Sequence, residues 1–419
     1  MKVLVLGAGV VGLATAYYLQ RDGHAVTLVE RAEQPALGSS YGNAGGLCPS
    51  FAGPWAAPGM VGKVLRMMGQ ADAPIRFRPQ WDTHQWRWIA RWVAQCRPEA
   101  FRRNKLRMQR VAHYSLACLK ALADEAGLHD FDFHADGTLW FFRTPQEVAY
   151  GRLAAQALDE FGVPWRWLAP DALDAFEPAL AARTAAVAGA LHLPADASGD
   201  SFKFSHALQR RLQAEGVAMR WGTTVQALLP EGDRIRGVRT SAGELGADAC
   251  VVALGAQAPF LLRPLGLDVP VYPVKGYSIT VPLRPGAADF RPALMDEHNK
   301  VMISRLGNRV RAAGMAELGG YGLDADLRQR DLLLRVVREY VPGALREDGP
   351  VEFWAGLRPM TPDGPAILGA TRWRNLFLNA GHGSNGWTQA CGTSRIVADL
   401  VSGRQPEIDL EGLGPERFA

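Results

Sequence analysis

The chain is poor in the features that mark secreted, membrane-spanning or nucleic-acid-binding proteins. No apolar run approaches the ~18 residues of a membrane span. The net charge of +4 is too small to indicate nucleic-acid binding by itself. Cysteines are few and scattered, which predicts reduced thiols in the cytoplasm rather than a disulfide framework or a zinc site, and we expect no metal. The five are Cys48, Cys96, Cys118, Cys250 and Cys391.

Length and composition predict a soluble enzyme with two domains. A chain of 419 residues can bury a large core, and its 48% hydrophobic and 21% charged content is typical of a globular protein. We expect no secretory leader, because the first apolar segment reads as a core strand without a charged flank or cleavage site.

The first thirty residues predict a dinucleotide-binding unit. A short apolar strand leads into a G-x-G-x-x-G turn at Gly7, Gly9 and Gly12, and a helical pattern follows. The first glycine permits the tight turn, the second lets a pyrophosphate approach the backbone, and the third lets helix and strand pack closely. A second strand ends in Glu30, whose carboxylate is expected to accept hydrogen bonds from a ribose. Further contacts are expected from Val10, Val11 and Arg31.

A glycine-rich loop near the C-terminus has the same arrangement. A buried strand over 376–379 leads into this loop, and a helix with small residues on one face follows. Its N–H groups and positive dipole end would serve a second negative centre of the cofactor. Two such helix ends suit FAD better than NAD, because charge accumulates on a flavin ring during reduction. The expected contacts are Gly381, His382, Gly383, Ser384, Asn385, Gly386, Trp387 and Thr388.

Other small-residue segments are also expected to pass close to the cofactor. One is a polar loop after the second strand, and another is a turn that follows an apolar strand over 248–254. The predicted contacts are Ser39, Ser40, Asn43, Ala44, Gly45, Gly46, Val225, Ala253, Leu254 and Gly255.

Because these signals recur at both ends and in the middle of the chain, we expect interleaved domains. The predicted fold class is α/β, with a Rossmann-type FAD-binding domain and an α+β substrate domain built on an antiparallel sheet. The FAD-binding domain is expected over 1–55, 190–265 and 355–419, and the substrate-binding domain over 56–189 and 266–354. Within the latter, 60–127 is predicted to be rich in helix.

Several motifs, in order along most of the chain, resemble one known family. They are GAGVVGLATAYYL at 7–19, NAGG at 43–46, PWAAPG at 54–59, GTLWFFRT at 137–144, PVKGYSIT at 273–280, GLRPMTPDG at 356–364 and NAGHGSNGWTQACG at 379–392. The sequence is similar to the FAD-dependent D-amino-acid oxidase superfamily and, within it, to the bacterial D-amino-acid dehydrogenases. The PWAAPG, GLRPMTPDG and GHGSNGWT segments are more specific than the first motif, which many flavoproteins share.

The resemblance implies non-covalent FAD and oxidative deamination of a D-amino acid to a 2-oxo acid and ammonia. Hydride would pass from Cα to flavin N5, and the electrons would go on to a quinone or another carrier. The chain departs from the family pattern at Ser40–Gly42, at Gly46–Cys48 and at Ser384–Asn385. These differences lie near the predicted flavin and substrate, so they bear on the preferred side chain more than on the reaction class.

Three residues are predicted to act on the substrate. Arg358 matches the family's carboxylate-binding arginine, and a guanidinium fork suits a bidentate pair with a carboxylate. Tyr277 lies on a predicted strand and could donate to the same carboxylate or simply pack. His382 could place a proton near the flavin or the amine, or its ring could pack while Gly381 and Gly383 act through their backbone.

The segment 76–110 is basic and rich in tryptophan. It contains ten arginines and lysines but only two acidic residues, Asp82 and Glu99. Four tryptophans lie in the same segment: Trp81, Trp86, Trp88 and Trp92. Such a helical stretch can lie in the headgroup zone of a bilayer, which would place a cytoplasmic protein peripherally on the inner face of the membrane. The alternative is that the tryptophans pack on the substrate domain while the arginines are solvated.

Four functions remain open from the sequence. The first is a D-amino-acid dehydrogenase, and the second is the same chemistry on a cyclic substrate such as D-proline or D-hydroxyproline. The third is a glycine- or sarcosine-type amine oxidase that uses oxygen. The fourth is a flavoprotein subunit of a hetero-oligomer.

Overall fold

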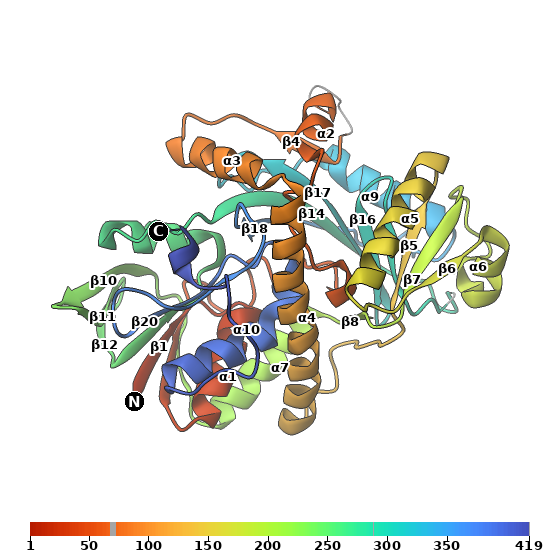
Figure 1. Cartoon of the computed structure of the whole chain (residues 1–419). Coiled ribbons are helices and arrows are strands. Elements are labelled where there is room, and N and C mark those ends of the chain that lie inside the picture. The colour runs from red at the N-terminus through yellow and green to blue at the C-terminus, as the bar shows by residue number, and fades with distance from the viewer. Residues whose placement is uncertain (68–72, 288, 419) are drawn as a thin grey trace.

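The computed structural model of the chain describes residues 1–67, 73–287 and 289–418, and its strands form two large sheets (Figure 1). In Figure 1 the long helix α4 (Pro98–Ala126) stands between the helices that cover the first sheet and the strands of the second. The candidate site lies between the two sheets.

The first sheet has six strands and the predicted Rossmann-type arrangement. Its apolar central strands pair in parallel and are buried on both faces, as parallel sheets require; only the pair at one edge is antiparallel. The order is β19 (Ile367–Ala370), β20 (Leu376–Ala380), β13 (Ala249–Val252), β1 (Lys2–Leu6), β2 (Ala25–Val29) and β9 (Ala218–Arg220).

Helices cover one face of this sheet, and a small sheet covers the other. The first layer contains α1 (Val10–Arg21), α7 (Ser201–Ala214), α10 (Gly386–Val401) and α4, whose buried residues share one apolar cluster. Behind the other face lie α8 (Ala258–Leu262) and an antiparallel sheet of β10 (Val225–Glu231), β11 (Arg234–Thr240) and β12 (Gly243–Gly246).

The second sheet has nine strands and is mostly antiparallel, as predicted for a substrate domain. The order is β18 (Glu352–Met360), β14 (Tyr272–Pro282), β17 (Arg309–Leu318), β16 (Val301–Leu306), β15 (Ala293–Asp296), β5 (Thr138–Phe142), β7 (Gly189–Leu193) and β6 (Arg166–Leu168), with β4 (Ile75–Phe77) beside β17. Only the β15–β5 and β17–β4 pairs are parallel. Helix α9 (Leu327–Tyr340) packs on one face.

The other face of this sheet carries a row of residues directly opposite one another on successive strands. Directly paired residues in neighbouring strands project to the same face, so this row marks the surface that faces the first sheet. From β18 to β5 it consists of Trp354, Ser278, Ala313, Met302, Met295 and Trp140.

The remaining elements are short or peripheral. A two-stranded pair joins β3 (Gly46–Leu47) and β8 (Ala197–Ser198). On the nine-stranded sheet, α5 (Pro145–Glu160) packs against Trp140 and Phe142, and α3 (Thr83–Gln95) packs against Tyr272 and Val274. α6 (Pro170–Phe176) joins the cluster of α9, and α2 (Met60–Met67) lies beside β4. The stretch 60–127 is mainly helical as expected, and its residues 68–72 lie outside the described residues.

Some elements lie across the predicted domain boundaries. β7 and β18 contain residues 190 and 355, where the boundaries were placed, and both pair within the nine-stranded sheet. α4, expected in the substrate-binding domain, packs against α1 and α10 because Val111, Leu116 and Leu119 join their apolar cluster. The division into domains stays a prediction.

Candidate active site

One cavity of about 1100 Å³ extends from the glycine turn after β1 to the inward face of the nine-stranded sheet. It exceeds the ~300–1,000 Å³ of pockets that hold one drug-sized ligand. The residues at its wall come from both sheets and from the loops between them, so it can hold an extended dinucleotide together with a small substrate.

The three glycines of the first turn have different roles. Gly7 has φ +104°, and a Cβ added there would lie 2.6 Å from the carbonyl oxygen of Ala253. A Cβ on Gly12 would lie 1.9 Å from the carbonyl oxygen of Gly7, so these two glycines close the turn. Gly9 is different, because a Cβ there would meet only Ser40 Oγ, at 3.4 Å. Gly9 therefore leaves open the space that a pyrophosphate would occupy.

Glu30 lies at the end of β2, where its carboxylate is fixed by the backbone. The N–H of Ala8 donates to Oε2 at 2.7 Å, and the N–H of Ala32 donates to Oε1 at 3.0 Å. A carboxylate accepts about four hydrogen bonds, so capacity remains for ribose hydroxyls. The same end of the cavity is lined by Val10, Val11, Arg31, Val225, Ala253, Leu254 and Gly255.

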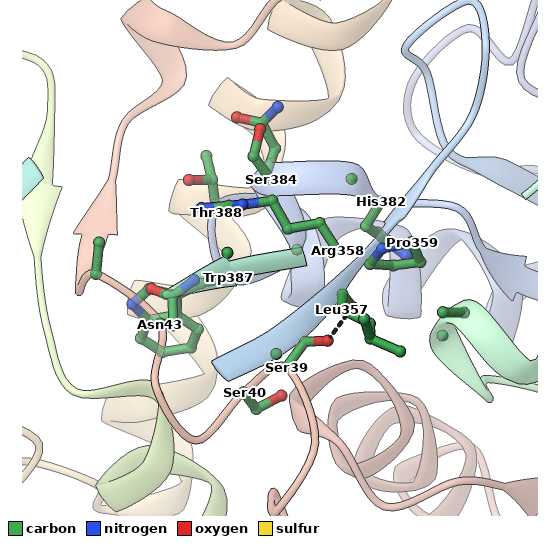
Figure 2. Close-up of a pocket in the computed structure, with 18 of the residues that line it drawn as sticks. Ser39, Ser40, Asn43, Leu357, Arg358, Pro359, His382, Ser384, Trp387 and Thr388 are labelled. Carbon is green, nitrogen blue, oxygen red and sulfur yellow. Dashed lines mark hydrogen bonds between the residues drawn. The ribbon is translucent and has the colours of Figure 1, made fainter. Parts of the chain in front are cut away.

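The loop that contains Ser39–Gly46 is held by contacts from both sides. Ser40 Oγ accepts from the N–H of Val10 at the start of α1 (3.1 Å), and the hydroxyl of Ser39 donates to the carbonyl of Leu357 in β18 (Figure 2). Asn43 Oδ1 accepts from the N–H of Gly45 at 2.8 Å, so that amide supports the loop itself. Ser39, Ser40, Asn43, Ala44 and Gly46 line the cavity.

A buried arginine that the sequence analysis missed holds this loop in place. Arg311 Nη1 donates to the carbonyls of Tyr41 (3.1 Å) and Asn43 (3.3 Å), and its Nε donates to Thr280 Oγ1 at 3.0 Å. Asp200 Oδ1 lies 3.7 Å away and also caps α7. Arg311 therefore connects the loop to β14 and β17 of the nine-stranded sheet.

The N-terminus of α10 opens on the same cavity as that of α1. Gly383, Ser384, Asn385, Gly386, Trp387 and Thr388 all line it. The indole of Trp387 is buried and donates to the carbonyl of Gly199 at 3.0 Å, so this residue can offer only its backbone. Two helix N-termini at one cavity give the paired positive dipole ends that a flavin dinucleotide needs.

Three of the predicted cofactor contacts do not line the cavity but lie just outside its wall. Gly12 closes the first turn. Gly45, at φ +89°, faces Ser304, and Gly381, at φ +76°, faces Thr361, whose Cγ2 would lie 2.6 Å from an added Cβ. These glycines shape the turns that carry the lining residues, because side chains there would meet neighbouring atoms.

His382 lines the cavity, as predicted, but its imidazole is buried against α10. Its Nε2 lies 3.0 Å from Thr393 Oγ1 on α10, the side chain is buried, and burial lowers the pKa of its imidazole to about 4. A neutral ring bonded to a helix is poorly placed to exchange protons with a substrate. The structure thus favours the alternative in which the loop acts through its backbone, and we do not propose His382 as a proton carrier.

Arg358 lies on the inward face of β18 at the cavity wall (Figure 2). Its Nη1 donates to the carbonyl of Met315 (2.7 Å) and its Nη2 to that of Gly314 (3.3 Å), where β17 bulges and Met315 has φ +58°. Burial lowers the pKa of the guanidinium to about 10, so it stays charged at neutral pH. Among the described residues no carboxylate pairs with it. A buried cation without a paired anion is energetically unfavourable, and the binding of an anion relieves that cost.

Tyr277 is among the residues that line the cavity, but its side chain does not share the position of Arg358. Its hydroxyl donates to Glu317 Oε2 at 3.3 Å, and its ring stacks on Phe353 within the cluster that packs against α9. The β14–β18 register pairs Tyr277 with Ala355 and Val274 with Arg358, so the phenol and the guanidinium project to opposite faces. We therefore remove Tyr277 from the proposed substrate contacts.

Gly276 is a positioning residue that the sequence analysis missed. Arg358 crosses β14 at this glycine to reach β17, and a Cβ on Gly276 would lie 2.1 Å from Arg358 Nη1. We expect Gly276→Ala to displace the guanidinium and raise KM for amino-acid substrates about tenfold, the cost of weakening one charge-assisted contact. FAD content should be unchanged. An unaltered KM would contradict this role, and the exposed Gly246→Ala is the control.

Comparisons with known proteins agree with this geometry. The family model described as "DAO: FAD dependent oxidoreductase" matches residues 2–400. Proteins called D-amino acid dehydrogenase from Rhizorhabdus wittichii and Agrobacterium fabrum are 44% and 43% identical to the chain, over 100% of both chains in each case. The resemblance inferred from the motifs is confirmed.

Solved structures share the fold at lower identity. Glycine oxidase from Geobacillus kaustophilus has a TM-score of 0.76 and 24% identity, covering 98% of this chain and 97% of its own. L-proline dehydrogenase from P. horikoshii has a TM-score of 0.75 and 21% identity, covering 100% and 97%. Together with the match over residues 2–400, these findings show that the chain belongs to the family of FAD-dependent oxidoreductases.

Proposed function

We propose that the chain oxidises D-amino acids to 2-oxo acids and ammonia and passes the electrons to a quinone. The observation that carries the proposal is Arg358, a buried cation at the cavity wall without a carboxylate partner among the described residues. A substrate carboxylate would supply the missing anion in a bidentate pair. The names of the full-length relatives support the D configuration.

The residues of the chain hold and orient the substrate. Arg358 holds the carboxylate, and the carbonyls of Gly314 and Met315 hold Arg358, so the carboxylate end of the amino acid has a defined position in the cavity. When bound, FAD would supply the ring that accepts a hydride from the substrate. The N-terminus of α10 would favour negative charge at its end of the cavity. The resulting imine hydrolyses in water to the 2-oxo acid and ammonia.

A substrate panel tests the proposal. Turnover of D- and L-amino acids, glycine, sarcosine, D-proline and D-hydroxyproline is measured anaerobically with an artificial electron acceptor. We expect turnover of acyclic D-amino acids and little turnover of their L enantiomers. A preference for D-proline or D-hydroxyproline would mean that the substrate is cyclic rather than acyclic. Turnover of glycine or sarcosine alone would contradict the proposal.

The acceptor and the assembly are tested separately. Peroxide released in proportion to turnover in air would identify an oxidase rather than a dehydrogenase. The isolated chain is also passed through a gel-filtration column. If it elutes as one homogeneous species and that species is active, the chain does not need a different subunit.

The basic tryptophan-rich segment divides into packed and exposed parts. Trp88 is buried and donates to the carbonyl of Met360 at 2.9 Å, while Arg91, Arg107 and Arg110 pair with Asp268, Glu411 and Asp409. Trp81 and Trp86 are exposed at 108% and 49%, as is Leu65 on α2 at 62%. No helix of the described residues has the length and apolar character of a membrane span.

We therefore propose a peripheral contact with the cytoplasmic face of the membrane, through α2 and the start of α3, which lie at one end of the molecule (Figure 1). Exposed indoles and arginines there suit the headgroup zone of anionic lipid. We expect the wild type to float with anionic liposomes, and Trp81→Ser/Trp86→Ser to float about tenfold less. Flotation no better than with neutral lipid would contradict the contact. Val351→Ser, at a site of 37% exposure, is the control.

A further inference from the structure

The cavity has a side arm between α4 and α5 that neither Arg358 nor the predicted cofactor contacts use. Residues of η1 (Pro49–Phe51), α4, α5 and β5 line it. The ones that matter here are Phe51, Phe101, Lys105, Trp140, Tyr150 and Leu153. Tyr150 and Leu153 are exposed at 49% and 65%, so the arm opens on the surface beside them.

The arm is walled by a series of aromatic rings. Phe51 follows Cys48, whose N–H donates to Thr388 Oγ1 at the start of α10 (3.1 Å), so the inner end lies beside the predicted flavin contacts. The Phe51 and Trp140 centroids are 4.6 Å apart, and those of Trp140 and Tyr150 are 5.8 Å apart. The series runs from the α10 end of the cavity to the surface and suits a flat, apolar ring.

Two lysines lie beside these rings: Lys300, 5.8 Å from the Tyr150 centroid, is paired with Glu297, whereas Lys105 is a separate cationic group of the arm. Its stem passes Gly53, with Cγ 3.8 Å from the position of an added Cβ, and its Nζ lies 5.3 Å from the Phe161 centroid and 6.0 Å from that of Phe101. Burial lowers the pKa of this ammonium. In the described part of the chain, no carboxylate is paired with it. An ammonium held among aromatic rings is suited to donate to a carbonyl oxygen that gains charge.

We propose that this arm binds the electron acceptor, a benzoquinone whose ring lies along the Phe51–Trp140–Tyr150 series and whose carbonyl oxygen accepts a hydrogen bond from Lys105. The inference deepens the proposed function and rests on it. Oxidation of the amino acid to the imine releases two electrons and two protons, and the quinone takes up two of each to become the quinol. The amino acid at Arg358 and the quinone in the arm thus occupy different parts of one cavity.

The test uses the FAD-loaded protein and ubiquinone-1, which carries one isoprenoid unit. We expect Lys105→Met to raise the Kd of ubiquinone-1 in calorimetric titration, and its KM in turnover, about tenfold or more. Ala157→Phe should do the same by filling the arm, because Ala157 lines it. Flavin reduction by D-alanine under anaerobic conditions should stay within about twofold of wild type in both variants. Lys120→Met, at an exposed site on α4, is the matched control.

Two results would overturn the site. One is an unchanged Kd for ubiquinone-1 in both variants, or no binding to the wild type. The other is slower flavin reduction by D-amino acids with an unchanged Kd, because the arm would then receive the substrate side chain. Since the calorimetric titration needs no amino acid, it supports or overturns the quinone site even if the proposed substrate class fails.

Discussion

Arg358→Met is expected to keep its full complement of FAD while kcat/KM for D-amino acids falls about 10²–10³-fold. The loss follows from removing one partner of a buried, hydrogen-bonded ion pair, which costs roughly 3–4 kcal/mol. Methionine matches the arginine side chain as far as Nε, so the apolar stem is kept while the carbonyls of Gly314 and Met315 lose their donors. Steady-state kinetics and the visible absorbance of the flavin measure the two effects.

Two controls separate binding of a carboxylate from general damage. Arg358→Lys should be intermediate, because an ammonium acts as a point charge where a guanidinium makes a fork. D-alaninamide, which lacks the carboxylate, should be a poor substrate of the wild type and should lose little further activity in Arg358→Met. If the acid and the amide lose activity equally, or if kinetics are unchanged, Arg358 does not bind the carboxylate.

Gly9→Val is expected to yield folded but colourless protein. The backbone at Gly9 is extended (φ −69°, ψ 174°), so valine fits the turn, and its first side-chain atom meets only Ser40 Oγ at 3.4 Å. The isopropyl group would then fill the space expected for the pyrophosphate and close the α1 end of the cavity to FAD. Flavin stoichiometry after reconstitution measures the loss, and circular dichroism confirms the fold.

The matched control is Gly246→Val on the exposed strand β12. A Cβ there would meet the carbonyl oxygen of Arg236 at 3.7 Å, an ordinary contact remote from the cavity. This variant should bind FAD as the wild type does. Normal flavin content in Gly9→Val would mean that the glycine turn does not hold the dinucleotide.

Local motifs made the nucleotide unit predictable from the sequence. The strand, the glycines and the acid at Glu30 are contiguous, and the structure places them as a β1–α1–β2 unit around one end of the cavity. The loop before α10 could be predicted equally well, because its glycines directly precede a helical pattern in the sequence. In both cases the chemistry is carried by neighbours along the chain, so no knowledge of distant packing was needed.

Contacts between distant strands could not be predicted in the same way. Tyr277 and Arg358 both lie in motifs that mark the substrate domain, but the β14–β18 register puts them on opposite faces. A register shift of one residue would reverse this result, and the sequence does not set it. Gly276 and Arg311 were missed for the same reason, since each acts on a side chain or loop that only strand pairing brings near.

The most direct test of the central claim is anaerobic mixing of the FAD-loaded wild type with D-alanine and, separately, with L-alanine. If Arg358 orients a D-amino acid for oxidation, D-alanine should bleach the visible flavin absorbance within the time of turnover, and L-alanine should leave it almost unchanged. Flavin that stays oxidised with D-alanine and with every other D-amino acid of the panel, or that is bleached equally by both enantiomers, would contradict the account.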